Sequence, residues 1–292
     1  MRLGSISFIN SLPVDLGITS GAVPFRGQTV PGDPAALNDA MLAGSVDAGP
    51  VSALWYGLHA RDLVLLPDLA IGSRSGVRSV LLFARAPLRE LGGSTRIAVT
   101  AQGKTTPVLL EILCRARYGF KPDTEVVPER LAGVPEGFDA ALVIGDDALV
   151  LGTSRARTEG LHVTDLGEEW RAWTGTPAVF AVWVARRAFF ETRPGEVAAA
   201  IEALARSRRW AAENPAAVVD EAARRTGLPR PVLEGYFSAL SYDFDEPMKR
   251  GLKLYFEHAA RLGFVPAVPS LETVRPSPSA LPAGASTPKD RP

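Results

Sequence analysis

Short apolar segments alternate with helical patterns along the first half of the chain, and this alternation narrows the choice of fold more than any other feature. One helix is clearly marked, because Asp33 can cap it and Pro34 suits its first position. Strands that alternate with helices form mostly parallel sheets covered by those helices. The chain is therefore predicted to be an α/β protein, with early strand candidates at 3–9, 46–51, 63–66, 96–100 and 140–144.

Two longer apolar strands, at 77–84 and 178–185, enclose a separate α/β block. A chain that enters a second unit and then returns crosses twice between two lobes, whereas a linear two-domain chain crosses once. Residues 195–264 are almost entirely helical in pattern and would complete the first lobe. We therefore predict a discontinuous lobe 1 formed by 1–86 plus 178–265, and a lobe 2 formed by 87–177.

The composition is that of an ordinary globular chain of 292 residues, 46% apolar and 22% charged. Its 32 Lys and Arg balance 32 Asp and Glu, so net charge favours neither nucleic acid nor an acidic membrane as a partner. An anionic ligand must then be held by local donors. Residues 266–292 contain seven prolines among Ser, Ala and Thr, which predicts a poorly ordered tail.

Cysteine and histidine content argues against metal chemistry. A single cysteine, Cys114, excludes an intrachain disulfide and a multi-cysteine metal site. The histidines, His59, His162 and His258, are scattered and form no ligand pair at helical spacing. A zinc hydrolase is disfavoured, and we expect neither a metal nor an organic cofactor.

The first residues read directly as a strand, without a basic and apolar leader before them. No later apolar run approaches the roughly 18 residues of a membrane span. We therefore expect a cytoplasmic protein without a membrane partner. The sequence leaves the oligomeric state open.

Polar residues gather where strands are followed by helices. In open α/β sheets the ligand lies beyond the carboxyl ends of the strands, where helix N-termini offer N–H donors. The alternative at each junction is a side chain that only caps its own helix. The candidate ligand-binding residues at these junctions are Asn10, Ser11, Ser52, Thr105, Thr106, Gly145 and Asp146.

The first crossing strand adds one further candidate. Ser79 would lie in the cleft between lobes, while Arg78 beside it alternates to the other face of the strand. We expect one of the two to meet the ligand.

The segment Gly103-Lys104-Thr105 after a strand suggests a phosphate-binding P-loop. The full motif needs a glycine five positions before Gly103, and that position is Ala98, within the strand. Nucleotide binding is therefore disfavoured.

Eight segments form a recognisable set in chain order: 7–13, 47–52, 66–72, 77–83, 144–146, 165–170, 173–177 and 179–183. Together they resemble the chorismate dehydratases of the futalosine route to menaquinone (the MqnA type). A sister family, the 1,4-dihydroxy-6-naphthoate synthases, usually opens with a Ser-Pro-Cys-Pro-Asn-Asp type motif that this chain lacks. The family often has small polar residues where this chain has Gln102-Gly103-Lys104, so a ligand role for Lys104 is not carried over.

The resemblance implies a type 2 periplasmic-binding-protein fold, with two α/β lobes joined by two crossing strands and a cleft between them. It also implies a carbon–oxygen lyase that binds a small dicarboxylate, chorismate, and releases 3-[(1-carboxyvinyl)oxy]benzoate and water. Two alternatives stay open: the naphthoate-forming sister enzyme, and a non-catalytic cytoplasmic solute-binding protein of the same fold.

No histidine lies at the junctions, so the sequence offers no obvious general base. We therefore hypothesise that the enolpyruvyl carboxylate of chorismate takes the C3 proton itself. Asn10 is the predicted catalytic residue, orienting the substrate and stabilising developing charge. Thr105 and Thr106 would bind a carboxylate, and Ser79 would bond another polar group.

Overall fold

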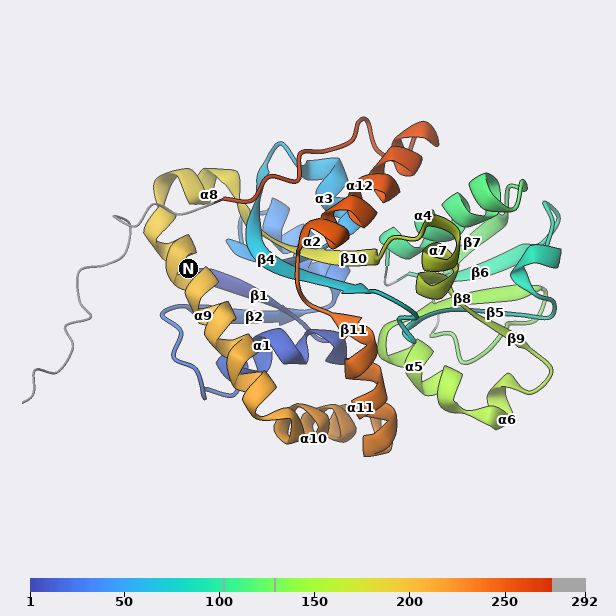
Figure 1. Cartoon of the computed structure of the whole chain (residues 1–292), viewed down its shortest axis with the longest axis horizontal. Helices are drawn as coiled ribbons and strands as arrows, with labels where there is room; N and C mark the ends of the chain where they lie inside the picture. Colours follow the sequence, from blue (N-terminus) through green and yellow to red (C-terminus); the bar gives the residue numbers. More distant parts are fainter. Residues whose placement is uncertain (102, 129, 275–292) are drawn as a thin grey trace, which may run out of the picture.

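The computed structural model describes residues 1–101, 103–128 and 130–274, and each of its two lobes is built around its own sheet (Figure 1). Lobe 1 holds a six-stranded sheet in the order β11-β4-β10-β3-β1-β2. Strand β1 pairs in parallel with β2 and β3, whereas β10 runs antiparallel between β3 and β4. These strands are β1 (Arg2–Ile6), β2 (Gln28–Gly32), β3 (Ala48–Ser52), β4 (Leu63–Ser73), β10 (Ala178–Arg186) and β11 (Leu240–Ser241).

Lobe 2 holds a five-stranded sheet in the order β7-β6-β8-β5-β9. Strand β6 pairs in parallel with β7 and β8, and β5 runs antiparallel between β8 and β9. Every residue of β5 and β8 is buried, as expected for strands covered on both faces. These strands are β5 (Val80–Ala84), β6 (Arg96–Thr100), β7 (Asp123–Val127), β8 (Ala140–Ile144) and β9 (His162–Asp165).

Strands β5 and β10 are each the first strand after a crossing, and each inserts antiparallel into the sheet of the lobe just entered. The predicted fold class is confirmed. The predicted boundary at residue 86 differs from this pairing, because it left Val80–Ala84 in lobe 1. The two long apolar strands look alike in sequence, so composition alone did not show which sheet each one joins.

Helices cover the faces of both sheets and leave the carboxyl ends of the parallel strands facing the other lobe (Figure 1). Those of lobe 1 are α1 (Leu12–Thr19), α2 (Pro34–Leu42), α3 (Ala53–His59), α8 (Arg187–Thr192), α9 (Pro194–Glu213), α10 (Pro215–Thr226), α11 (Arg230–Ala239) and α12 (Glu246–Arg261). Those of lobe 2 are α4 (Thr105–Ile112), α5 (Gly145–Thr153), α6 (Arg155–Thr158) and α7 (Leu166–Thr174). Short 3-10 turns η1 (Ile9–Ser11) and η2 (Leu88–Glu90) and the π-helical turn η3 (Leu113–Arg117) complete the described elements.

Helix α2 shows how local sequence fixes an element. Asp33 accepts a hydrogen bond from Ala36 N at 2.8 Å, and Pro34 occupies the first turn, as predicted. Leu37 and Met41 are buried against the sheet at helical spacing. The cap and the apolar face therefore agree on where this helix begins and how it packs.

Strand β1 is shorter than its predicted range of 3–9. It ends at Ile6, because the chain then turns into η1 at Ile9. Because of this turn, the residues after β1 approach lobe 2 and do not extend the sheet.

The first part of the predicted tail lies against lobe 1. Val274 N donates to Leu65 O at 2.9 Å, and the Tyr56 hydroxyl donates to Ser270 O. Residues 266–274 are thus held beside β4 and α3, in contrast to the predicted poor order. The remainder of that prediction, for 275–292, lies outside the described residues.

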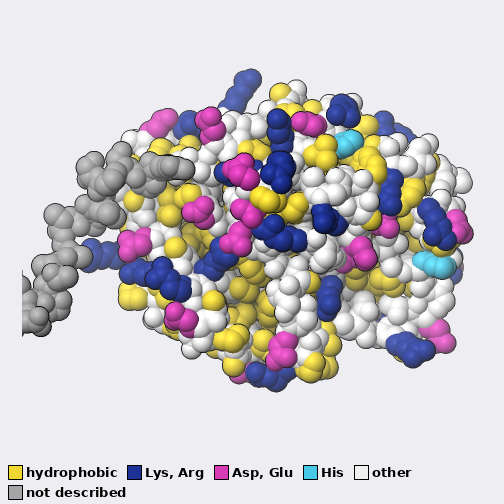
Figure 2. Space-filling model, in the orientation of Figure 1, with side chains coloured by type: hydrophobic (Ala, Val, Ile, Leu, Met, Phe, Trp, Pro, Cys, Tyr) yellow, Lys and Arg dark blue, Asp and Glu magenta, His cyan; other side chains and the backbone are white. Residues whose placement is uncertain are grey.

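The surface carries charges of both signs. Figure 2 shows Lys and Arg side chains interspersed with Asp and Glu over the viewed face, in keeping with the balanced composition. Within the part of the chain that the structure describes, none of the helices combines the length and the apolar character needed to cross a bilayer.

Candidate functional site

A cavity lies between the two lobes and encloses about 660 Å³, its open mouth included. Its polar lining consists of Asn10, Ser52, Ser79, Lys104, Thr105 and Thr106. Much of the remaining wall is apolar, from Ile6, Phe8, Ile71, Val77, Val80, Ile144, Phe180 and Leu240.

Three polar atoms of lining residues are buried without a hydrogen-bond partner among the described residues: Asn10 Oδ1, Ser52 Oγ and Thr106 Oγ1. A buried polar atom left unsatisfied costs about 1–3 kcal/mol, so such atoms are uncommon in proteins. Three of them around one cavity indicate a place where a polar ligand supplies the missing partners. They come from both lobes, which means that a ligand here would bridge them.

Ser52 stands directly before α3 with the extended backbone of a helix cap, but its side chain makes no cap hydrogen bond. The oxygen that caps this helix belongs to lobe 2, since Leu54 N donates to Thr105 Oγ1 at 2.9 Å. The alternative that Ser52 only caps its own helix is therefore not what the structure shows. Its hydroxyl lines the cavity instead.

Helix α4 begins at Thr105. Thr105 and Thr106 are both buried and both line the cavity. The first N–H groups of a helix have no partner within it and carry a partial positive charge. The start of α4 thus offers the cavity an anion-binding edge beside the Thr106 hydroxyl. Lys104 lies at the same edge with an exposed side chain.

Ser79 lies in the first crossing and is buried, whereas Arg78 beside it is exposed. Ser79 lines the cavity, and Arg78 is not among the described residues that do. The Tyr236 hydroxyl donates to Ser79 Oγ at 3.0 Å, and burial raises the pKa of that phenol. Ser79 Oγ therefore accepts a hydrogen bond from Tyr236 and donates a longer one, of 3.4 Å, to Val77 O.

Asn10 lies in η1, and backbone groups on either side of its Cα are hydrogen-bonded to other elements. Its carbonyl accepts a hydrogen bond from the Tyr242 hydroxyl at 2.9 Å. The preceding amide, Ile9 N, donates to Asp146 Oδ1 of lobe 2 at 3.1 Å. The backbone of Asn10 is thus fixed, while its side-chain oxygen, at the cavity wall, is buried and has no partner among the described residues.

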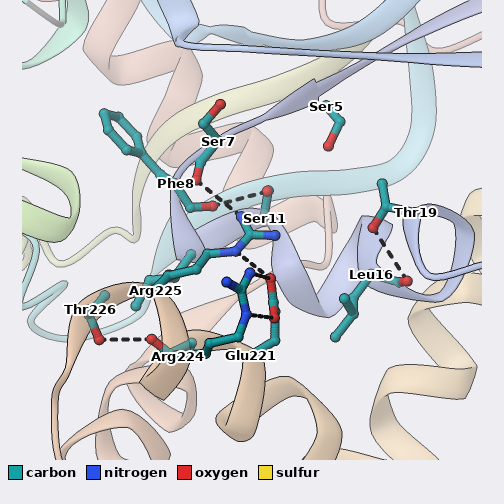
Figure 3. Close-up of polar contacts among 12 residues, drawn as sticks. Ser5, Ser7, Phe8, Ser11, Leu16, Thr19, Glu221, Arg224, Arg225 and Thr226 are labelled. Carbon is teal, nitrogen blue, oxygen red and sulfur yellow. Dashed lines mark hydrogen bonds and ion pairs between the residues drawn. The ribbon is translucent and has the colours of Figure 1, made fainter.

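Ser11 is fully buried and does not line the cavity, contrary to its predicted ligand role. Its hydroxyl lies 2.9 Å from Ile6 O and 3.1 Å from Phe8 O, and Figure 3 shows it turned toward Phe8. It also approaches the buried carboxyl of Asp15 at 3.4 Å. Ser11 therefore shapes the turn that carries Asn10 and is removed from the candidate site.

Asp146 also lies outside the cavity, contrary to its predicted ligand role. It lines a neighbouring hollow together with Arg130 and Arg225, and burial raises its pKa to about 6. Figure 3 shows how Arg225 reaches across from α10, where its guanidinium donates to Ser7 O and pairs with Glu221. Asp146 thus ties the lobes together through Ile9 and does not face the ligand.

Gly145 lines the cavity, and its backbone explains why glycine stands there. Its φ is +65°, and a Cβ at this position would lie 3.0 Å from the ring of Phe8. The aromatic ring of lobe 1 therefore packs directly on the backbone of lobe 2.

Several residues in the lining or directly behind it carried no signal in the sequence. Phe8 and Phe180 are partly buried aromatics of a kind that usually belongs to a core, and Tyr236 and Tyr242 come from the C-terminal helical region. Only the folded chain brings these tyrosines to Ser79 and Asn10.

Metal-ligating side chains do not cluster in the described part of the chain. Over residues 1–101, 103–128 and 130–274, no three His, Cys, Asp or Glu are placed to hold a metal ion. The donors around the cavity are hydroxyls, an amide and backbone N–H groups. Such a set suits hydrogen bonding to an anionic organic molecule.

Solved structures share this architecture. The protein AF1704 from Archaeoglobus fulgidus matches with a TM-score of 0.71 and 22% identity, over 90% of this chain and 98% of that one. The periplasmic aliphatic sulphonate binding protein SsuA from Escherichia coli matches with a TM-score of 0.65 and 15% identity, over 92% of this chain and 94% of that one. At these identities the likeness shows the fold, which is that of the periplasmic binding proteins.

Sequence relatives are more specific. The chorismate dehydratase of Thermus thermophilus is 34% identical over 247 residues, which cover 80% of this chain and 86% of that protein. A family model described as menaquinone biosynthesis matches residues 1–261, nearly all of the described chain. These matches confirm the resemblance seen in the sequence motifs, and the chain belongs to the menaquinone biosynthesis family.

Proposed function

We propose that this protein is a chorismate dehydratase, which binds chorismate between its lobes and converts it to 3-[(1-carboxyvinyl)oxy]benzoate and water. The observation that carries the proposal is the convergence of Asn10 Oδ1, Ser52 Oγ and Thr106 Oγ1, all buried without partners, on one cavity with apolar walls. Membership of the menaquinone biosynthesis family and the relative named chorismate dehydratase support it.

The cavity suits the parts of this substrate. Chorismate combines a flat apolar ring with two carboxylates, a ring hydroxyl and an enol ether. Apolar side chains such as Phe8, Ile144 and Phe180 can cover the ring. The Thr106 hydroxyl and the first N–H groups of α4 can hold a carboxylate.

The elimination removes the proton from C3 and the hydroxyl from C4. The electron pair of the C3–H bond becomes a ring π bond, the C4–O bond breaks, and the proton and hydroxyl leave as water. The ring becomes aromatic, so the reaction is strongly downhill. The protein's task is to favour this path over the other reactions open to chorismate.

The described lining of the cavity contains no carboxylate, imidazole or thiol, and its one ionisable side chain, Lys104, is exposed. A protein base is therefore not at hand, which supports proton removal by the enolpyruvyl carboxylate of the substrate itself. The chain then acts by holding that carboxylate near C3, and positioning of this kind can supply about 7–11 kcal/mol.

Asn10 and Ser79 are placed to handle the charge that develops during elimination. The Asn10 side chain offers an amide to the cavity from a rigid turn, and Ser79 offers a hydroxyl whose bond to Val77 O is long enough, at 3.4 Å, to be exchanged for one to the substrate. Fixed donors stabilise developing charge because they need no reorganisation during the reaction.

The test is direct. Purified protein, dialysed against a chelator, is mixed with chorismate and followed by liquid chromatography with mass detection. An aromatic product lighter than chorismate by one water, formed over many turnovers, supports the proposal. Stoichiometric binding of unchanged chorismate would contradict it and favour a solute-binding protein. Heat-denatured protein gives the background of spontaneous chorismate decay.

A further inference from the structure

We propose that Thr105 is a positioning residue, which caps helix α3 from the opposite lobe and thereby leaves the Ser52 hydroxyl free to face the substrate. The kinetic test of this role rests on the proposed function, whereas the structural test does not.

Ser52 has the geometry of a residue that caps its own helix. Its φ of −66° and ψ of 146° place it directly before α3, where a serine oxygen ordinarily accepts the N–H of the second or third helical residue. Here the second residue, Leu54, gives its N–H to Thr105 Oγ1 at 2.9 Å. Ser52 Oγ is left buried, with no partner in the part of the chain that the structure describes.

Thr105 is held firmly enough to act in this way. It is only 4% exposed and is the first residue of α4. Its carbonyl accepts a hydrogen bond from the Tyr255 hydroxyl at 3.2 Å, from helix α12 of lobe 1. Two separate elements of lobe 1 therefore fix this one residue of lobe 2.

Thr105 Oγ1 and Ser52 Oγ compete for the N–H group of Leu54. When the lobes are apart, Thr105 is withdrawn and Ser52 is the residue whose backbone already suits the cap. When the lobes meet, Thr105 takes over the N–H of Leu54 and the Ser52 hydroxyl turns to the cavity. Closure thus converts a structural hydroxyl into a ligand-binding one.

The same arrangement occurs at the neighbouring junction. Ile9 N, at the start of η1, gives its hydrogen bond to Asp146 of lobe 2, and no side chain of lobe 1 caps this turn. Next to it, Asn10 Oδ1 faces the cavity without a partner. At both junctions lobe 2 satisfies the backbone of lobe 1 and leaves the adjacent polar side chain free.

The kinetic test is a double-mutant cycle with Ser52→Ala, Thr105→Val and the double variant, assayed with chorismate. Valine keeps the branched shape of threonine without its oxygen. If Thr105 acts through Ser52, each single change lowers kcat by about tenfold and the double variant loses hardly more than either. Losses that multiply to about a hundredfold would show that Thr105 acts independently of Ser52 and would overturn the proposal.

Thr105→Ser, which keeps the oxygen, is expected to recover most of the turnover lost in Thr105→Val. If serine restores nothing, the cap is not the reason for the loss. Thermal unfolding of each variant separates this result from failure to fold.

A second readout is independent of activity. Amide hydrogen exchange at Leu54, measured by NMR in the ligand-free protein, should stay near the wild-type rate in Thr105→Val, because Ser52 then takes over the cap. It should quicken in the double variant, which lacks both oxygens. Unchanged exchange in the double variant, or fast exchange in Thr105→Val alone, would refute the competition between the two caps. If the wild-type protein does not turn over chorismate, the proposed function fails, while this comparison still decides the role of Thr105.

Discussion

The Tyr236 hydroxyl donates a hydrogen bond of 3.0 Å to Ser79 Oγ and so joins helix α11 to the first crossing between the lobes. Because burial raises the pKa of Tyr236, its phenol stays protonated and remains a donor. This bond fixes the direction in which Ser79 can give its own proton. The positions of the two residues in the chain, 157 apart, gave no hint of the contact.

Tyr236→Phe is therefore expected to lower kcat/KM for chorismate by about 3- to 10-fold, since a neutral hydrogen bond contributes about 0.5–1.5 kcal/mol. Steady-state kinetics measure the change. Tyr118→Phe is the matched control. The Tyr118 hydroxyl donates to Glu169 on lobe 2, and Tyr118 is not among the described residues that line the cavity. Equal losses in both variants would contradict a role for Tyr236 at the site.

Asn10→Ala is expected to reduce kcat by about 100-fold or more, as is usual when one preorganised polar group is lost. Asn38→Ala is its control. Asn38 Oδ1 is also buried without a partner, but it lies in α2 and outside the described lining of the cavity. Turnover assays should separate the two variants. Near-normal turnover in Asn10→Ala would show that Asn10 is not central.

Gly145→Ala tests the packing of the two lobes. The new Cβ would stand 3.0 Å from the Phe8 ring in a backbone with φ of +65°. Gly160→Ala has nearly the same strain, with φ of +73°, but meets nothing within 4 Å. Both should lose about 1 kcal/mol through backbone strain, and Gly145→Ala should lose about 1–3 kcal/mol more.

Part of that extra cost is expected as weaker closure, which would raise the KM for chorismate by about tenfold in Gly145→Ala and leave it unchanged in Gly160→Ala. Urea unfolding measures the loss of unfolding free energy, and steady-state kinetics measure the KM for chorismate. A KM that rises equally in both variants would mean that the Phe8 contact does not govern closure.

Asp15 predicts a dependence of stability on pH. Burial raises its pKa to about 6 from 3.8, against the opposing influence of the Ser5 and Ser11 hydroxyls and the charge of Arg225. Between those values the folded protein binds more protons than the unfolded chain, so stability must fall as the pH rises. This contribution is complete at about pH 4 and is lost above about pH 6.

Relative to Asp15→Asn, the free energy of unfolding of the wild type should therefore fall by up to about 3 kcal/mol between pH 4 and pH 7. Urea titrations at the two pH values measure it. Asp146, whose pKa is raised in the same direction, contributes equally to both proteins and cancels in the difference. Parallel pH profiles would show that Asp15 stays ionised in the fold.

The sequence predicted elements well where local rules act alone. Helix α2 begins where Asp33 and Pro34 indicate, and strand β8 has its predicted bounds of Ala140–Ile144. Alternation of strands and helices was enough for the fold class. The strand at Val80–Ala84 was assigned to the wrong sheet, because the partner of an apolar strand depends on long-range pairing.

The sequence predicted those residues of the candidate site that follow the carboxyl ends of strands. Asn10, Ser52, Ser79, Thr105, Thr106 and Gly145 all line the cavity. Ser11 and Asp146 do not, although they stand at the same junctions. Residue type and spacing identify a junction, but the side that a given hydroxyl or carboxylate takes depends on partners from distant elements, such as Asp15 and Ile9.

The position of β10 has a consequence for the order in which the chain can fold during synthesis. This strand lies between β3 and β4, yet it follows all of lobe 2 in the sequence. The strands of lobe 2 form one uninterrupted stretch, Val80–Asp165, whereas the sheet of lobe 1 has a gap until Arg186 has left the ribosome. Lobe 2 can therefore form before lobe 1 is complete. Until β10 is synthesised, β3 and β4 each keep an unpaired apolar edge.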